Sequence, residues 1–194
     1  MRQRVIESGT VSIDVIVKPG GSLLAHRALL DAALGAIARR AEHERIVVVP
    51  GGGPFADAVR RVDTTLALSS GAAHWMAILG MDQYAHLIAD RMARAVVADD
   101  AVAIEAVLAE SAIPVLAPSR WLRRVDPLPH SWDVTSDSIA AWFAETLRAR
   151  RLVLIKPPGS AGDLVDPYFA RALPAGVEYL AIPADRLDQF PDLR

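Results

Sequence analysis

Two lysines stand out in this chain, because arginine supplies nearly all of its other basic side chains. Of the 21 Lys and Arg residues, only Lys18 and Lys156 are lysines. Each ends an apolar run and precedes a Pro- and Gly-containing turn, in VIVKPGG and LVLIKPPG. Ammonium groups at such turns can neutralise the charge that develops on a phosphoryl group during its transfer. Either lysine alone could equally be a solvated residue at the end of a strand.

Two glycine-rich turns, at 20–22 and 51–53, each lie between an apolar run and a segment with helical spacing. Glycine permits positive φ and lets a ligand approach backbone N–H groups closely. Such turns at the carboxyl ends of parallel strands bind anions, although a lone GGG also occurs where segments only pack tightly. Neither turn has the GxxxxGK[ST] or GxGxxG spacing, so neither a Walker nor a Rossmann nucleotide site is supported. The candidate phosphate-binding residues are Gly20, Gly21, Ser22, Gly51, Gly52 and Gly53.

The polar segment 130–138, HSWDVTSDS, leads into an apolar helical pattern. Thr135 and Ser136 have short side chains that suit a helix N-cap, which is the simplest interpretation. Asp137 adds a carboxylate, which could lie between the two ammonium groups or help to hold Mg²⁺. If the acceptor is itself a phosphate, no catalytic base is needed, because its oxygen is already an anionic nucleophile.

Other groups that could do chemistry give weaker signals. The five histidines have neither HxH nor HExxH spacing, which argues against a zinc site. Ser22 and Ser70 lack the GxSxG context of a hydrolase nucleophile. His74, in a long helical pattern, is either a core residue or a substrate contact. The absence of cysteine excludes disulfides, thiolate metal sites and a cysteine nucleophile.

The elements that must position these groups alternate between strand and helix patterns, which predicts an α/β fold with a parallel sheet and right-handed crossovers. The segment 120–129, with two prolines, is expected to be a loop, and the tail 157–194 to hold one short helix near Tyr168 and one strand at 178–182. The expected strands are 12–18, 45–49, 95–98, 113–117 and 152–156. The expected helices are 23–40, 55–68, 71–94, 102–110 and 137–150.

Composition describes a globular protein and gives no sign of a nucleic-acid or membrane partner. Hydrophobic residues make up 52% of the chain, and the formal net charge of -2 offers no general attraction to polyanions. There is no apolar run of about 18 residues and no secretory pattern at the N-terminus, so we expect a cytoplasmic protein. The length of 194 residues suits a single domain, 1–194. The apolar long helix, with Trp75 and Trp121 expected to be exposed, favours a homo-oligomer.

Three motifs together resemble the amino acid kinase family in their order and spacing: VKPGGSLL, IVVVPGGGPFADAVRRVD and HSWDVTSDSIAAW. The similarity extends over about 15–155. Within the family, HSWDVTSDS and AHWMAILGMDQYAHLIA are most similar to kinases that phosphorylate a furan-type phosphate monoester in methylofuran and one-carbon cofactor biosynthesis. The resemblance implies an open three-layer αβα sandwich with a mainly parallel sheet, ATP and Mg²⁺ as the phosphoryl donor, and a phosphate monoester as the acceptor.

The resemblance also implies roles for individual residues. The first glycine turn would surround the ATP phosphates, the second would bind the acceptor, and Asp137 would orient the catalytic lysines. The predicted catalytic residues are Lys18, Asp137 and Lys156. The predicted cofactor-binding residues are Gly20, Gly21, Ser22, Thr135 and Ser136. The predicted substrate-binding residues are Gly51, Gly52, Gly53, Arg60, Asp63 and His74.

The sequence departs from the family pattern after the last predicted strand. Relatives read TDVDG where this chain reads LIKPPGS, the nucleotide-binding part at about 157–194 is short, and Pro19 removes one backbone N–H from the first glycine turn. Two interpretations therefore stay open. Lys156 is the second catalytic lysine of an active kinase, or the ATP half is reduced and the chain is a non-catalytic binding or assembly protein on a degenerate kinase fold.

Overall fold

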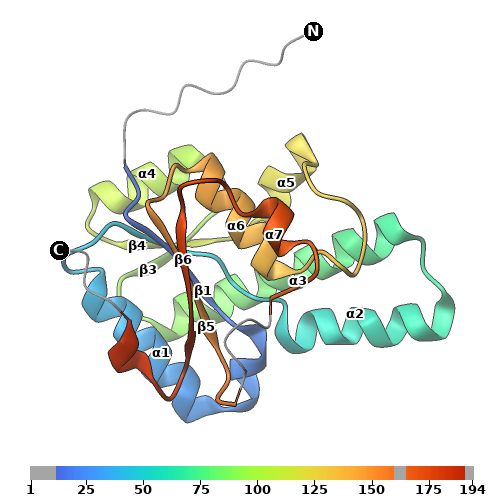
Figure 1. The fold of residues 1–194 in the computed structure, drawn as a ribbon, viewed down its shortest axis with the longest axis horizontal. Coiled ribbons are helices and arrows are strands. Elements are labelled where there is room, and N and C mark those ends of the chain that lie inside the picture. The colour runs from blue at the N-terminus through green and yellow to red at the C-terminus, as the bar shows by residue number, and fades with distance from the viewer. Residues whose placement is uncertain (1–11, 160–164, 191–194) are drawn as a thin grey trace, which may run out of the picture.

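A parallel β-sheet runs through the centre of the molecule in the computed structural model, which describes residues 12–159 and 165–190 (Figure 1). The expectations for the N-terminal 1–11, for 160–164 after the altered loop and for 191–194 lie outside these residues. Six described strands form the sheet in the order β3-β4-β2-β1-β5-β6, and every pairing is parallel. The strands are β1 (Val15–Pro19), β2 (Ile46–Val48), β3 (Ala95–Ala98), β4 (Ile113–Leu116), β5 (Arg151–Lys156) and β6 (Glu178–Pro183).

The register of the central strands determines where the two lysines lie. β1 is paired with β5 so that Lys18 is opposite Leu154 and Pro19 is opposite Ile155. Because the strands are adjacent and parallel, their carboxyl ends meet at one edge of the sheet. Lys18 and Lys156 are therefore brought to the same edge from positions 138 residues apart in the sequence.

Helices cover both faces of the sheet, which confirms the predicted three-layer α/β fold (Figure 1). In β1, Val15 and Val17 pack into the core under α1 and part of α3, whereas Ile16 packs into the core under α4 and α6, as the two-residue period of a strand requires. The helices are η1 (Gly21–Ala25), α1 (Arg27–Arg40), α2 (Gly53–Leu66), α3 (Ser70–Arg91), α4 (Ala101–Ala109), α5 (Ser119–Val125), α6 (Ser136–Thr146), α7 (Phe169–Ala172) and η2 (Leu187–Gln189).

The helix α5 corrects the prediction of a loop at 120–129. Its three arginines and Leu122 are good helix formers, Leu122 is buried, and the backbone N–H of Ser119 donates to the Asp82 carboxylate at 3.1 Å. The two prolines in the segment lie beyond Asp126, where φ of 38° ends the helix. The prolines therefore follow the helix and do not prevent it.

Smaller differences concern helix ends and two tryptophans. The predicted helix 23–40 is divided at His26, whose backbone is not helical, into a 3-10 turn and α1. The predicted helix 137–150, which is α6, ends at Thr146 and not near 150. Trp75 and Trp121, expected to be exposed, are partly buried against the core, so they give no support to a homo-oligomer, which stays a prediction. The short helix near Tyr168 and the final strand are present as α7 and β6.

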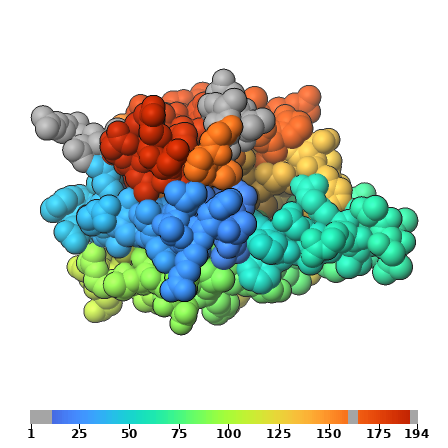
Figure 2. Space-filling model, turned by 90° about the horizontal axis from the view of Figure 1, so that it is seen from below, coloured from blue at the N-terminus to red at the C-terminus, as the bar shows by residue number. Residues whose placement is uncertain are grey.

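Helices α2 and α3 pack along each other and project from one end of the sheet (Figures 1 and 2). The close approach uses Gly80, where an added Cβ would lie 3.1 Å from the Cβ of Phe55. Glycine within a helix is therefore a packing requirement at this position. No helix in residues 12–159 and 165–190 is long and apolar enough to cross a membrane.

Candidate active site

Three charged side chains from three elements meet at the carboxyl edge of the sheet. The Asp137 carboxylate, in the first turn of α6, has Oδ1 2.9 Å from Nζ of Lys18 and Oδ2 2.5 Å from Nζ of Lys156. Asp137 and Lys18 are each only 4% exposed. Two roles were predicted for Asp137, a position between the two ammonium groups or help in holding Mg²⁺. In the structure its carboxylate lies between the ammonium groups.

Charge in this cluster is unbalanced in a way that favours an anion. Burial tends to raise the pKa of Asp137, but the charges and hydrogen bonds of Lys18 and Lys156 outweigh it and hold that pKa below its usual value. Burial and the charge of Lys18 lower the pKa of Lys156, and the attraction of Asp137 only partly offsets them. Two ammonium groups share one carboxylate, so one positive charge is left without a partner within the cluster. The negative charge of a bound phosphate would supply that partner.

The first turn of α6 is held by a carboxylate from a distant part of the chain. Thr135 is the N-cap, and its hydroxyl accepts from the N–H of Asp137 at 3.4 Å. Asp166, which follows the undescribed segment, accepts hydrogen bonds from the backbone N–H groups of Thr135 and Ser138 at 2.9 and 3.0 Å. No sequence pattern predicts this contact, because the partners are 31 and 28 residues apart and belong to no common motif.

The two glycine turns contact each other directly. A Cβ at Gly21 would lie 2.0 Å from the backbone nitrogen of Gly53, and a Cβ at Gly51 would lie 2.4 Å from that of Gly21. Gly53 also has φ of +52°, which favours glycine. Tight packing thus explains part of the glycine pattern. The N–H of Gly20 donates to the carbonyl of Ile155 at 2.8 Å, which ties the first turn to β5.

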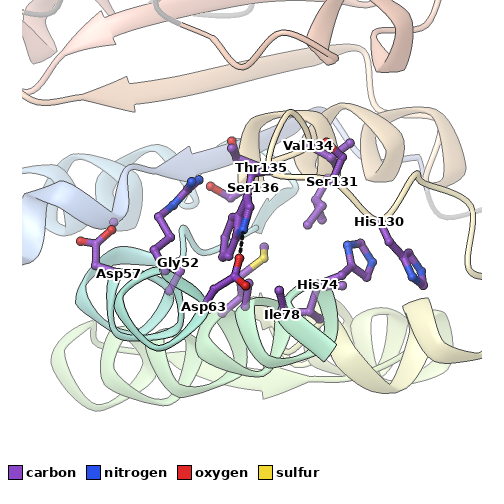
Figure 3. A pocket seen from close by; sticks show the side chains of 18 of the residues that line it. Gly52, Asp57, Asp63, His74, Ile78, His130, Ser131, Val134, Thr135 and Ser136 are labelled. Atoms are coloured by element: carbon purple, nitrogen blue, oxygen red, sulfur yellow. Dashed lines mark hydrogen bonds between the residues drawn. The ribbon is translucent and has the colours of Figure 1, made fainter. Parts of the chain in front are cut away.

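A cavity of about 420 Å³ opens beside these turns, between α2, α3 and the segment 130–139 (Figure 3). One part of its wall is a linked set of side chains: the Arg60 guanidinium lies 4.0 Å from the Trp132 ring centroid, and Trp132 Nε1 donates to Asp63 at 2.7 Å. The second Asp63 oxygen accepts from the N–H of Leu68 at 3.0 Å, which fixes the carboxylate against the end of α2. Arg60 places a cation where a phosphate could enter the cavity.

The rings of His74 and His130 form another part of the cavity wall (Figure 3). The rings of His74 and His130 stack with centroids 4.1 Å apart, and the Trp75 ring meets both edge-on. His130 Nε2 lies 2.8 Å from an Asp126 oxygen. Burial, together with the charge of His130, lowers the pKa of His74 to about 4, so this ring is neutral at physiological pH.

The stacked histidines and Asp126 are three groups that could in principle be metal ligands. Ligand atoms of His74, Asp126 and His130 lie within 4.8 Å of one another, a grouping that sequence spacing did not indicate. The two imidazole planes are nearly parallel, at 17°, so their nitrogen lone pairs do not converge on a common point. In this arrangement the histidines form a stacked wall, and a zinc site is not supported.

The predicted site residues thus fall into two connected groups. Lys18, Asp137 and Lys156 form the charged cluster. The predicted residues that line the cavity are Gly21, Gly52, Gly53, Arg60, Asp63, His74, Thr135 and Ser136. Gly20, Ser22 and Gly51 lie in the two turns and not among the lining residues.

Comparison with known proteins agrees with this geometry. Residues 15–157 match the amino acid kinase family, and the chain belongs to that family. It is similar to the [5-(aminomethyl)furan-3-yl]methyl phosphate kinase of Methanocaldococcus jannaschii, with 33% identity over 139 residues, which cover 72% of this chain and 63% of that protein.

Solved structures show the same fold. The UMP kinase from Ureaplasma parvum superposes with a TM-score of 0.65 over 92% of both chains, at 12% sequence identity. The uridylate kinase from Archaeoglobus fulgidus superposes with a TM-score of 0.57 over 74% of this chain and 63% of its own, at 18% identity. At such identities the likeness concerns the fold alone.

Proposed function

We propose that the chain is an ATP-dependent phosphotransferase whose acceptor is the phosphate of a small monoester. The observation that carries the proposal is the buried carboxylate between two ammonium groups, in a chain that has only two lysines. The cluster has two ammonium groups in contact with one carboxylate, near a cavity with an arginine in its wall. That combination suits a reaction in which two phosphate groups must come together.

The acceptor would lie in the cavity, with its phosphate near Arg60 and the turn at 51–53. An oxygen of this phosphate attacks the γ-phosphorus of ATP, so that a new P–O bond forms as the bond to the β,γ-bridging oxygen breaks. The products are ADP and a diphosphate. Lys18 and Lys156 would stabilise charge on the transferred group, and Asp137 would keep their ammonium groups in place.

The donor would be ATP with Mg²⁺. The positive cluster and the adjoining glycine turn fit a polyphosphate, and Mg²⁺ bound with ATP would neutralise the β- and γ-phosphate oxygens. Both Asp137 oxygens face ammonium groups, so we expect the ion to be carried by the nucleotide. The chain would then act as one domain.

The proposed acceptor is [5-(aminomethyl)furan-3-yl]methyl phosphate, the compound in the name of the 33% identical relative. A furan is a small flat ring, and the cavity offers aromatic side chains at His74, His130 and Trp132. Production of its diphosphate would place the chain in one-carbon cofactor biosynthesis.

Purified protein with Mg-ATP and this phosphate tests the proposal, with ADP release followed by a coupled assay and the new diphosphate by ³¹P NMR. Turnover is expected, and Lys156→Ala should reduce kcat at least a hundredfold. Arg27→Ala, which removes an 84% exposed cation from α1, is the matched control and should behave like wild type. Equal turnover by Lys156→Ala and Arg27→Ala would contradict the proposed role.

A second candidate is a non-catalytic binding or assembly protein, favoured by the altered KPPG turn after β5. Calorimetry separates the two. Binding of the phosphate monoester without ATP binding or ADP release would support the second candidate. Tight ATP binding together with turnover would remove it.

A further inference from the structure

Asp166 is a buried carboxylate outside every motif that indicated function. It is 9% exposed, and it lies just after the part of the chain in which the family sequence pattern is altered. Its Oδ2 accepts from the N–H and the hydroxyl of Thr135, at 2.9 and 2.8 Å, and from the N–H of Ser138 at 3.0 Å. Its Oδ1 accepts from the Ser138 hydroxyl and from the N–H of Tyr168 at 3.1 Å.

These contacts give Asp166 a task that the first acidic residue of a helix normally performs. The free N–H groups and the positive dipole at a helix N-terminus favour a carboxylate in the first turn. In α6 that residue is Asp137, but its two oxygens face Lys18 and Lys156. Asp166 supplies the missing negative charge and the hydrogen-bond acceptors from outside the helix.

The geometry restricts Asp137 directly. Asp166 binds Thr135 and Ser138, the residues two before and one after Asp137. A backbone held at both points cannot rotate the first turn of α6 without breaking these hydrogen bonds. The direction of the Asp137 side chain therefore depends on Asp166.

Asp166 also acts on the cluster through its charge. The charged groups that affect Lys156 are Lys18, Asp137 and Asp166, and the two carboxylates both raise the pKa of Lys156 against the effects of burial and Lys18. Loss of the Asp166 charge should lower the Lys156 pKa further. A purely mechanical tie between the tail and α6 would not predict this change.

We propose that Asp166 is a positioning residue, which holds the first turn of α6 so that Asp137 lies between the two lysines. The catalytic part of this inference rests on the proposed phosphotransferase function, whereas the positional part does not. The inference extends the functional unit to a residue beyond the matched range 15–157. It also gives the altered C-terminal part a task other than adenine binding.

The chain offers a direct test, because it contains only two lysines. Selective ¹⁵N-lysine labelling gives NMR signals from Lys18 and Lys156 alone, and a pH titration follows each without any need for turnover. In Asp166→Asn, one amide NH₂ must face donors that Asp166 now accepts from. We expect the lysine signals to shift, the Lys156 titration to move to lower pH, and kcat to fall at least tenfold with a smaller change in KM for ATP.

The matched control is Asp90→Asn, which removes the same charge from an exposed position near the end of α3. It should leave the lysine signals and kcat unchanged. Should Asp166→Asn fail to fold, Ser138→Ala keeps the Asp166 charge and removes one hydrogen bond, and we then expect a kcat reduced several-fold with the Lys156 titration nearly unchanged.

The outcomes are distinguishable. A folded Asp166→Asn protein with wild-type lysine signals, Lys156 titration and kcat would overturn the positioning role. Altered lysine signals in Asp166→Asn, with no turnover by wild type, would support positioning while the proposed function fails. A loss of kcat in Asp166→Asn without any change in the lysine signals or the Lys156 titration would also overturn the positioning role.

Discussion

The charged cluster and the aromatic wall of the cavity are built on different principles. Lys18, Asp137 and Lys156 are held by one another at 2.5–2.9 Å, with Lys18 and Asp137 buried and Lys156 partly buried. His74 and His130 are partly exposed, stack on each other and face open volume. The first region has a fixed charge pattern that suits any transferred phosphoryl group. The second offers a surface whose fit depends on the ligand, so we expect it to select the acceptor.

The largest effect is expected from removing the negative charge at the centre of the charged cluster. Asp137→Asn removes the carboxylate that contacts both ammonium groups, one buried and one partly buried. We expect the free energy of unfolding to fall by about 3–5 kcal/mol, with loss of nearly all turnover. Urea denaturation measures the first and the coupled assay the second. Asp133→Asn, an exposed neighbour, is the control; equal stability of both variants would show that the cluster is not a unit.

The charge of Lys156, in the charged cluster, should make kcat depend on pH. Because its pKa is lowered and the charged form is required, kcat should decline with rising pH on a limb below the ordinary lysine value of 10.5. In Lys156→Arg the side chain stays protonated, so any remaining activity should lack this limb. A pH–rate profile between pH 6 and 10.5 measures both. An identical limb in the arginine variant would assign it to another group.

On the cavity side, Arg60 is expected to act on acceptor binding. Arg60→Gln removes the cation over Trp132, and KM for the phosphate acceptor should rise about tenfold, the effect of one charge-assisted hydrogen bond. KM for ATP should stay within twofold. Arg61→Gln, next to it on α2 and outside the cavity lining, is the control. An equal rise in the acceptor KM in both variants would assign the effect to the overall charge of α2 and not to Arg60.

The smallest effect is expected at the stacked histidines. His74→Ala removes one ring of the wall, and KM for the acceptor should rise about threefold to tenfold, the range of one aromatic contact. Because the His74 pKa is about 4, the wild-type KM should show no titration of this residue between pH 6 and 8. His86→Ala, exposed on α3, is the control. A larger effect on kcat than on KM would show that His74 acts on the reacting groups and not on acceptor binding.

The two regions also differ in how far sequence predicted them. Lys18 and Lys156 each end an apolar strand pattern, and parallel strands meet at their carboxyl ends, so local patterns were enough to bring both to one edge. Asp137 was predicted because its helix start is also visible in the sequence. Asp166 and the pair of Asp126 with His130 had no such signal, since Asp166 and Asp126 lie in irregular segments that no periodicity describes. The sequence does not predict α5, because the helix is only seven residues long and two prolines follow closely after it.

The contact between the glycine turns has a consequence for variation and design. Gly21 and Gly53 touch through their backbones, so a side chain at either would displace the other turn. A sequence change in one turn must therefore be answered by a change in the other. The proposed donor and acceptor turns therefore form one packing unit, and grafting one of them alone from another kinase into this chain should fail.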